Sequence, residues 1–267
     1  MNPKISIITV CFNSVNILEQ TIMSVTNQLY DNIEYIIIDG GSKDGTVDII
    51  KKHESKITYW VSEPDNGIYD AMNKGIKHAT GEWINFMNAG DSFASFDIIS
   101  TIFIKNYSIL KNKSAIYGDS IVCISLGEKY SKCIKPFWKD ESFIPDKGFS
   151  HQSSFVRSDY AKLHPFDTSF KICADFKMLY DLYKADNKSF VYIPFAIAKY
   201  EVENGFSKQN ATLAYKENAL IIGKNKHPLF FLYYFKFKSN KIAHDYLSSF
   251  LKKNFPKLFN YIKMKRL

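Results

Sequence analysis

The sequence predicts an α/β protein with a mainly parallel central sheet, helices on both faces of that sheet, and a basic helical tail. Two patterns predict the sheet. Short apolar runs rich in β-branched residues recur through the first ninety residues, and segments with helical spacing separate them. The third observation is an uneven charge: residues 224–267 hold eleven Lys or Arg and one acid, a net +10, whereas residues 1–223 sum to −2.

The first part of the chain alternates strands and helices. Helical spacing is clearest in residues 68–79, whose apolar or small side chains recur at i, i+3, i+4, i+7 and i+8 and so share one face. The predicted strands are 4–10, 33–39, 57–62 and 82–88, and the predicted helices are 17–27, 45–54 and 68–79.

The remainder of the chain has a more mixed pattern. Residues 174–185 read as an amphipathic helix, with four apolar or aromatic side chains on one side. Further predicted elements are strands at 114–124 and 153–158, two short strands around Pro194 within 189–200, and helix from about residue 207 onward.

The composition excludes several classes of protein. With 46% hydrophobic and 23% charged residues, the 267-residue chain is expected to be globular rather than disordered. Its four cysteines are scattered without a CxxC pair, so neither a disulfide framework nor a zinc site is expected and a reducing cytosol fits. No stretch approaches the roughly 20 apolar residues of a membrane span, and the first residues do not resemble a signal peptide.

Polar clusters follow three of the predicted strands. Asp39 ends the second strand, Asp65 to Asp70 follow the third, and Asn88 to Asp91 follow the fourth. Ligands of parallel sheets bind beyond the carboxyl ends of the strands. These acids are therefore expected to converge on one crevice.

Each cluster has a chemical interpretation and a plainer structural alternative. In DGGSKDGT (39–46), Asp39 could accept the imide N–H of a uracil or a ribose hydroxyl, whereas Ser42 or Asp44 could merely cap the next helix. Asp65 or Asn66 could likewise only start a helix. Tyr69 and Asn73 lie one turn apart and are predicted on the face away from the apolar stripe, where they could present a hydroxyl and an amide to a sugar.

The third cluster, NAGD (88–91), could hold a cation. Asp91 follows Asn88, Ala89 and Gly90, so the backbone can approach a ligand closely. Hard divalent cations often take few protein oxygens and several from phosphate or water. The alternative is that Asp91 is an ordinary turn residue.

Together these motifs resemble the catalytic domain of family-2 glycosyltransferases, which have the GT-A fold. TVCFN, DGGSKDGT, SEPDNGIYDAMNKG, ATGEW and MNAGD carry the resemblance over about residues 3–95, and SHQSSF, ADFKMLYDL and NGFS extend it loosely to about residue 210. The sequence departs from the family at the fourth strand, where these enzymes usually have Asp-x-Asp. Asn88 and Gly90 stand here instead of acids, so only Asp91 remains.

The resemblance implies an inverting transferase that uses a nucleotide-diphosphate sugar, with UDP as the expected nucleotide and GDP or dTDP as alternatives. It implies that Thr9 and Val10 line the base, and that Asp39 and Asp65 contact the base or ribose. It also implies that Asp91 holds Mn²⁺ or Mg²⁺ against the diphosphate. The full implied nucleotide-sugar site is Thr9, Val10, Asn13, Asp39, Gly40, Asp65, Gly67, Tyr69, Asp70, Asn73, Asn88, Ala89 and Gly90.

The same resemblance places the catalytic base at the start of a later helix. Asp175 matches that place, with Asp181 as the weaker candidate, and the alternative is a plain N-terminal helix acid. His151 and Gln152 are implied to contact the diphosphate or the acceptor, unless His151 is only structural. Residues 1–210 form the implied catalytic domain, with a nucleotide-sugar half (1–95) and an acceptor half (96–210).

The tail, residues 211–267, interleaves aromatic, leucine and lysine side chains. This pattern favours association with an anionic membrane surface, where lipid-linked acceptors lie. The family resemblance further implies extension of a bacterial surface polysaccharide, such as lipopolysaccharide or capsule, and with this tail the expected place is the inner face of the cytoplasmic membrane, without nucleic acid. Two alternatives remain: a nucleotidyltransferase on a similar sheet, and a non-catalytic basic protein that binds membrane or nucleic acid.

Overall fold

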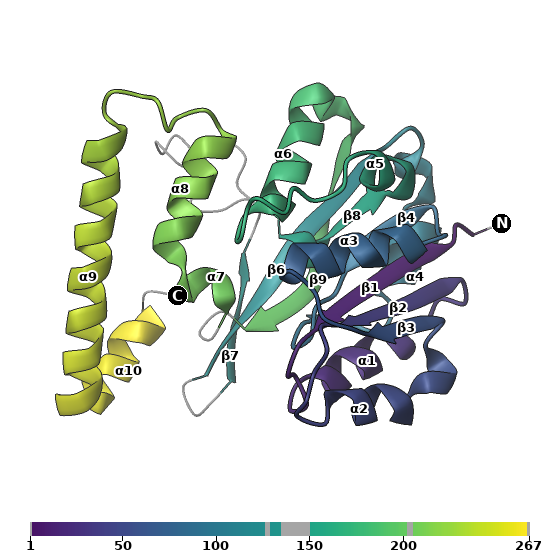
Figure 1. The fold of residues 1–267 in the computed structure, drawn as a ribbon, viewed down its shortest axis with the longest axis horizontal. Coiled ribbons are helices and arrows are strands. Elements are labelled where there is room, and N and C mark those ends of the chain that lie inside the picture. The colour runs from purple at the N-terminus through teal and green to yellow at the C-terminus, as the bar shows by residue number, and fades with distance from the viewer. Residues whose placement is uncertain (1, 126–128, 135–149, 202–204, 266–267) are drawn as a thin grey trace.

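The structure, a computed structural model, describes residues 2–125, 129–134, 150–201 and 205–265 (Figure 1). The strands are β1 (Ile5–Cys11), β2 (Ile33–Asp39), β3 (Tyr59–Ser62), β4 (Trp83–Phe86), β5 (Ser92–Phe93), β6 (Ala115–Ser125), β7 (Lys129–Ile134), β8 (Ser154–Arg157) and β9 (Phe190–Glu201). The helices are α1 (Leu18–Thr26), α2 (Thr46–Lys52), α3 (Ile68–His78), α4 (Ile98–Ser100), α5 (Ser158–Leu163), α6 (Ala174–Ala185), α7 (Phe206–Gln209), α8 (Ala211–Ile221), α9 (Phe230–Asn254) and α10 (Pro256–Lys265). Short helical turns lie at Glu54–Lys56, Thr101–Lys105, Tyr107–Leu110, His151–Ser153 and Asn187–Ser189.

The strands form one sheet in the order β3-β2-β1-β4-β8-β6-β9-β5, with β7 paired to β6. β1 is parallel to both β2 and β4, and β2 is parallel to β3, so these four carboxyl ends meet at one edge. β6 and β9 are also parallel, whereas β5, β7 and β8 run antiparallel to their neighbours. The predicted α/β fold is confirmed.

Helices cover both faces of the sheet, because successive side chains of a strand point to opposite faces. Ile5 and Ile7 of β1 belong to a buried cluster with residues of α1, α2 and α4. Ile8 and Val10 belong to a second cluster with residues of α3, α5 and α6. The two clusters form a core on each side of the sheet, and the site at its carboxyl edge rests on both.

The predicted strands and helices occur, apart from two differences. Residues 189–200 form one strand, not two, and the register with β6 shifts between Gly118 and Ser120, opposite the Pro194 segment. A proline cannot donate to the ladder, so such an irregularity accommodates it without ending the strand. The short β5, α4 and α5 were not predicted because they are too short to show a periodic pattern, and β7 was missed because its sequence, KYSKCI, is mostly polar.

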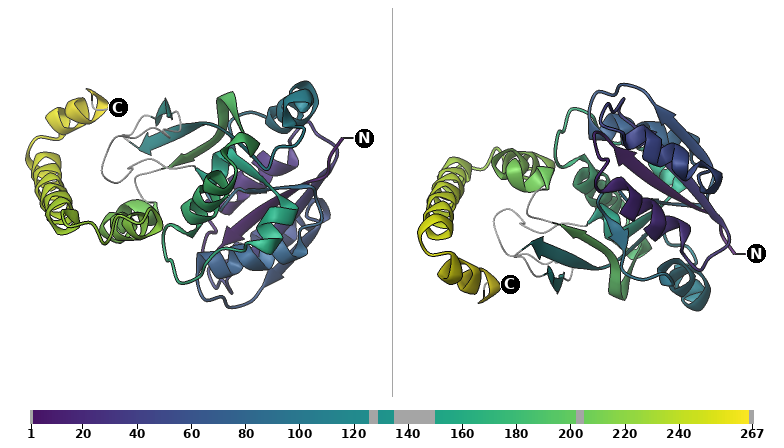
Figure 2. Two further views of the ribbon diagram at one scale, coloured as in Figure 1. Left: turned by 90° about the horizontal axis from the view of Figure 1, so that it is seen from above. Right: turned by 90° about the horizontal axis from the view of Figure 1, so that it is seen from below.

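The C-terminal segment is helical, as predicted. α8 packs on α6 through a small cluster that includes Ile221 and Ile222, and it contacts α9 through Ala219 and Phe230. α9 lies on the side of α8 that faces away from the sheet, and both further views show the same arrangement (Figures 1 and 2). Among the helices in the described residues, none is both long and apolar enough to cross a membrane.

Candidate active site

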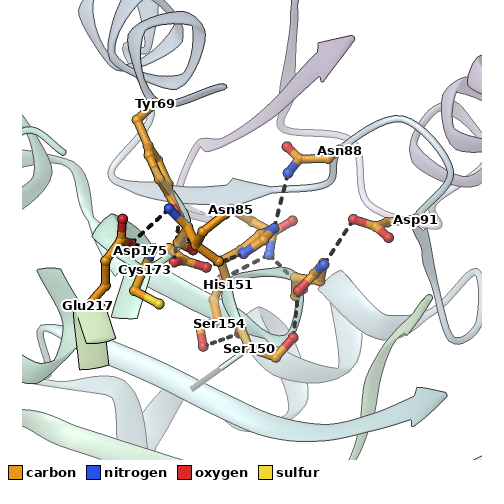
Figure 3. Close-up of polar contacts among 12 residues, drawn as sticks. Tyr69, Asn85, Asn88, Asp91, Ser150, His151, Ser154, Cys173, Asp175 and Glu217 are labelled. Atoms are coloured by element: carbon orange, nitrogen blue, oxygen red, sulfur yellow. Dashed lines mark hydrogen bonds and ion pairs between the residues drawn. The ribbon is translucent and has the colours of Figure 1, made fainter. Parts of the chain in front are cut away.

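The carboxyl ends of β1 to β4 bring the predicted site residues together in two groups. Asp39, Gly40 and Asp65 form the first group: a Cβ added to Gly40 would lie 2.5 Å from Oδ2 of Asp65. The second group joins the Asn88–Asp91 turn to residues that follow much later in the chain (Figure 3). The first group follows β2 and β3 and the second follows β4, on the other side of β1, so both groups border the same edge of the sheet.

Asp39 is fully buried, and donors within the protein already satisfy its carboxylate. Oδ2 accepts hydrogen bonds from the Ser42 amide at 2.9 Å, the Gly41 amide at 3.1 Å and the Ser62 hydroxyl at 2.6 Å. Oδ1 accepts from the Ser42 hydroxyl at 2.5 Å and the Cys11 thiol at 3.5 Å. In this geometry Asp39 fixes the 40–42 loop, and contact with a nucleobase would require that loop to shift. Its predicted role in base binding stays a prediction.

Asp65 begins the turn that leads into α3. Its Oδ1 accepts a hydrogen bond from the Gly67 amide at 2.8 Å, which leaves Oδ2 beside Gly40. Gly67 precedes the helix with φ +113, a conformation that favours glycine. Asp70 reaches back from the first turn to accept from the Asn66 amide at 2.9 Å, so it fixes the turn that precedes the helix. Asp65 is therefore the acid of this turn with an oxygen directed at the neighbouring loop.

The last residues of β1 and the residues just after it show the same contrast between buried and accessible groups. Thr9 is fully buried, with its hydroxyl 3.0 Å from the Tyr35 hydroxyl and donating to Met87 O at 2.7 Å. Val10 is buried as well. Asn13 is exposed, and its Oδ1 accepts from the Lys43 amide at 3.1 Å. Of these three residues of the implied nucleotide-sugar site, only Asn13 presents its side chain at the surface.

The prediction that Tyr69 lies on the face of α3 away from its apolar stripe is wrong. Tyr69 is 5% exposed and packs in the core, because α3 is covered by the segment that precedes α6. Asn73 uses both ends of its amide on that segment, accepting from the Phe166 amide and donating to the Phe166 carbonyl, each at 2.8 Å. Both side chains hold the 166–172 segment against α3, and their contact with a sugar stays a prediction.

The Asn88–Asp91 turn is organised by Thr21, a residue of α1. The Thr21 hydroxyl accepts from the Gly90 amide at 2.9 Å and donates to the Asp91 carbonyl at 2.7 Å. Ala89 is tied to β1 by a backbone hydrogen bond to Val10 O at 3.2 Å. Gly90 has φ +96, so a side chain there would strain the turn. The turn thereby directs the Asp91 carboxylate toward Gln152.

Asp91 has the donor chemistry of a hard-cation ligand. Its Oδ2 accepts from Gln152 Nε2 at 3.1 Å. Burial raises the pKa of Asp91 to about 6, while the charge of His151 and the Gln152 hydrogen bond oppose that rise. The buried Oδ1 of the nearby Asn88 has no hydrogen-bond partner, so a second oxygen is open. Carboxylate and amide oxygens are the kinds of ligand that Mg²⁺ and Mn²⁺ take in proteins.

Such a cation would need further ligands from outside the protein. Among the residues that the structure describes, no three His, Cys, Asp or Glu side chains come together as metal ligands. Magnesium sites of this kind use one or two carboxylates and complete their shell with substrate phosphates and water. The donor set therefore fits a cation that binds together with a diphosphate.

A hydrogen-bonded chain joins the turn to Asp175 at the start of α6 (Figure 3). Asn88 Nδ2 lies 3.1 Å from His151 Nε2, and His151 Nδ1 lies 2.6 Å from Asp175 Oδ2. The Tyr69 hydroxyl lies 2.9 Å from Asp175 Oδ1 and 2.5 Å from the Ile172 carbonyl oxygen, so these two acceptors share its single proton. An aspartate at position 88 would be only an acceptor, whereas the amide of Asn88 can donate to a neutral imidazole. The Asn88 departure from the family pattern thus has a local function in this network.

The surroundings of the His151–Asp175 pair set its charges. Apolar side chains line a small pocket against it, among them Ile84, Phe86, Val156, Phe166, Met178 and Leu179. Burial would raise the pKa of Asp175, but the hydrogen bond and charge of His151 and the Tyr69 hydroxyl lower it in net. Burial would lower the pKa of His151, but Asp175 and the charge of Asp91 raise it in net. The pair therefore favours an ionised carboxylate.

Asp181, the second candidate for a catalytic base, lies elsewhere. It is exposed on α6 and forms an ion pair with Lys177 at 2.6 Å. This places Asp175, and not Asp181, in the network with His151.

Sequence reasoning missed three residues of this region. Thr21 lies within an apolar helical pattern and gave no signal. Phe12 is 61% exposed directly after β1, where an aromatic residue following a buried strand could have been noticed. Glu217 is a buried acid within α8, and only its partners in space reveal its position.

Comparison with known proteins agrees with this geometry. A family model described as glycosyl transferase family 2 matches residues 6–98. An uncharacterized glycosyltransferase of Mycobacterium tuberculosis is 35% identical over 179 residues, which is 65% of this chain and 66% of that protein. A PGL/p-HBAD biosynthesis glycosyltransferase of Mycobacterium bovis is 25% identical over 213 residues, covering 77% of this chain and 79% of that protein. The chain thus spans just under two thirds of the M. tuberculosis protein.

Solved structures show the same fold at low sequence identity. Residues 1–349 of TarS from S. aureus, in complex with UDP-GlcNAc, match with a TM-score of 0.63 and 16% identity over 83% of this chain and 66% of that chain. The mannosyltransferase PcManGT from Pyrobaculum calidifontis, in complex with GDP-Man and Mn²⁺, matches with a TM-score of 0.61 and 16% identity. That match covers 86% of this chain and 67% of the mannosyltransferase.

Proposed function

The chain belongs to glycosyltransferase family 2 and has the GT-A fold, and from its site we propose an inverting transfer of a sugar. The donor is a nucleotide-diphosphate sugar, with UDP as the nucleotide, and the acceptor is a hydroxyl group of a glycan. One observation carries the proposal: the adjacent residues His151 and Gln152 connect Asp175 to Asp91. The proposed base, Asp175, and the carboxylate proposed to lie beside the diphosphate, Asp91, are thus held by two neighbouring residues.

In this proposal Asp175 is the general base. Its carboxylate takes the proton of the acceptor hydroxyl as that oxygen attacks the anomeric carbon, a contribution of about 10²–10⁴-fold. Attack opposite the leaving diphosphate inverts the anomeric centre. His151 and Tyr69 hold the two carboxylate oxygens, so the base is oriented before the acceptor arrives.

Asp91 and Asn88 form the diphosphate side of the site. Asp91, with the open amide oxygen of Asn88, would hold Mn²⁺ or Mg²⁺ there, and the ion would neutralise charge that develops on the leaving diphosphate. Gln152 keeps the Asp91 carboxylate turned toward this position. PcManGT was solved with Mn²⁺, which supports metal use in this fold.

The nucleotide lies over the Asp39–Asp65 group, at the ends of β1, β2 and β3. Asn13 and Asp65 offer accessible side chains there, and the glycines of the 40–42 loop allow close approach of the backbone. The UDP-GlcNAc complex of TarS supports UDP as the donor nucleotide. The GDP-Man complex of PcManGT makes GDP the donor to be tested against it.

The acceptor is a lipid-linked glycan of a bacterial surface polysaccharide, and the tail holds the enzyme at the inner face of the membrane. Phe231, Phe235, Ile242 and Tyr246 follow one another along one stripe of α9 and are 60–76% exposed. Lysines flank them in a segment of net charge +10. An apolar stripe with basic neighbours suits an anionic bilayer. In this scheme residues 1–210 bind the donor and the acceptor, and the exposed stripe of α9 attaches the enzyme to the bilayer.

A donor panel tests the proposed function. Full-length protein would be incubated with UDP-, GDP-, dTDP- and CMP-sugars, with Mn²⁺ or with EDTA, while nucleotide release and thermal stability are followed. We expect donors of one nucleotide class to stabilise the protein. The nucleotide of these donors should be released slowly, and only when metal is present. If no donor is cleaved and none stabilises the protein, with or without metal, the result would favour the non-catalytic alternative.

A further inference from the structure

Glu217 lies outside the segment that the family model matches, and it contacts the chain just before Asp175. We infer that Glu217 is a positioning residue, which sets the place of the base by fixing residues 171–173. The inference rests on the proposed function, since it assigns Glu217 a part in the same reaction. In this inference α8 supports the catalytic site and is not only the first helix of the C-terminal tail.

The carboxylate of Glu217 is bound by three backbone amides in a row. Oε1 accepts from the Lys171 amide at 2.8 Å, and Oε2 accepts from the Ile172 and Cys173 amides at 2.9 Å each. Glu217 is 8% exposed, and in the described part of the chain no Lys or Arg forms an ion pair with it. The buried charge is therefore held by the loop itself and by the N-terminal end of α6, where a negative charge is favourable.

The same loop is bound from its other side by the residue that holds the base. The Tyr69 hydroxyl donates to the Ile172 carbonyl at 2.5 Å and lies 2.9 Å from Asp175 Oδ1. Residue 172 is thus fixed between Glu217 and Tyr69, three residues before Asp175. Figure 3 shows Glu217 and Cys173 on one side of this network and Asp91 on the other.

Loss of the carboxylate would release the loop. A glutamine at position 217 keeps the shape but turns an amide N–H₂ toward the backbone N–H groups, so at least one buried donor loses its acceptor. A displacement of about 1 Å at a catalytic group can lower the rate about 10²-fold. Glu217→Gln should therefore lower kcat by about 10–100-fold, while the donor site at the ends of β1 to β3 stays intact.

Glu34 provides a matched control. It is also a buried glutamate, 4% exposed, and it accepts from the Ser6 hydroxyl, the Thr80 amide and the Lys4 ammonium group. It lies at the start of β2, at the opposite end of the strand from Asp39. Glu34→Gln should lower the melting temperature as much as Glu217→Gln does, with kcat unchanged.

The experiment compares full-length wild type, Glu217→Gln and Glu34→Gln. Three quantities are measured: kcat for nucleotide release from the donor that the panel identifies, the Kd of the free nucleoside diphosphate, and hydrogen exchange of a peptide that spans residues 166–176. We expect a lower kcat in Glu217→Gln alone. In that variant the amide hydrogens of the 166–176 peptide should exchange faster, while Kd changes by less than about twofold.

Three results would overturn the inference alone: unchanged kcat in Glu217→Gln, unchanged exchange of the 166–176 peptide, or an equal loss of kcat in Glu34→Gln. If the wild type releases no nucleotide from any donor, the proposed function fails and the inference fails with it. The rate of nucleotide release by the wild type therefore tells the two failures apart.

Discussion

Nδ1 of His151 lies 2.6 Å from Oδ2 of Asp175, and both side chains are 17% exposed. This contact ties the helix that carries the proposed base to the segment that reaches Asp91. The other ring nitrogen, Nε2, lies 3.1 Å from Nδ2 of Asn88, so the same imidazole also contacts the turn that carries Asp91. The two halves of the site are thus set relative to each other by a single imidazole.

Without metal, the carboxylate of Asp91 should lower the free energy of unfolding of the protein. Its pKa is raised to about 6 in the folded protein, so the folded state keeps a proton that the unfolded chain releases, and stability falls as pH rises from about 4 to 6. Asp91→Asn should therefore raise the free energy of unfolding at pH 7.5 by about 1–3 kcal/mol in EDTA. Denaturant unfolding at pH 7.5 and at pH 4 measures this difference.

The same variant should lose its response to metal. Mn²⁺ together with the nucleoside diphosphate should raise the melting temperature of the wild type but not of Asp91→Asn. Asp159→Asn, at a side chain that is 74% exposed, is the control and should respond as the wild type does. An equal metal-dependent shift in Asp91→Asn would show that the cation binds elsewhere.

Gly40→Ala should weaken donor binding by displacing Asp65. Its new Cβ would lie 2.5 Å from Asp65 Oδ2, at the end of a side chain that can move, so the expected loss of stability is below about 1 kcal/mol. The donor Kd should rise about tenfold in a titration. A double-mutant cycle with Asp65→Ala tests whether Gly40→Ala acts through Asp65. The donor Kd of the double variant should be no higher than that of Asp65→Ala alone. Additive losses would mean that Gly40 acts independently of Asp65.

Glu34 should stabilise the fold in a pH-dependent way. Burial would raise its pKa, but hydrogen bonds from Ser6, Thr80 and Lys4 outweigh that effect and lower it to about 2. A lowered pKa in the folded state contributes stability that is present above the unfolded value and is lost as pH falls toward 2. Glu34→Gln should cost about 2–3 kcal/mol at pH 7 and progressively less between about pH 4.5 and 2. A cost that stays constant over that range would contradict this account.

The tail should bind anionic membranes through the apolar stripe of α9. Phe235→Ser with Tyr246→Ser should lower the vesicle-bound fraction about tenfold in flotation with phosphatidylglycerol vesicles, because two aromatic side chains no longer insert. Phe96→Ser with Tyr107→Ser, at positions that are each 58% exposed, is the matched control. Binding should also weaken at high salt. Equal binding of both double variants would exclude α9 as the attachment surface.

Local sequence patterns predicted most of the fold, because strand and helix periods are readable wherever an element is long and buried on one or both faces. The paired clusters around Ile7 and Ile8 follow directly from the alternation within β1. The short β5 and the uninterrupted β9 were missed, since their pairing depends on partners distant in the sequence.

Several of the predicted site residues lie together in the structure, whereas the exposure of their side chains could not be read from the sequence. His151, Gln152 and Asp175 were predicted from separate motifs, and they form one network. Tyr69 was misplaced, because its burial depends on the segment around Phe166, nearly a hundred residues later in the sequence. Glu217 was invisible for the same reason: its partners are backbone amides, which no sequence motif encodes.

The central claim is that two carboxylates divide the work, with Asp175 as base and Asp91 on the diphosphate side. Asp175→Asn tests it most directly, since the variant keeps the shape and can still accept from His151. The measurement is kcat for nucleotide release at saturating donor, with the Kd of the nucleoside diphosphate determined alongside. The account predicts a loss of about 10²–10⁴-fold in kcat with Kd changed by less than about twofold. A wild-type kcat in Asp175→Asn would contradict the account.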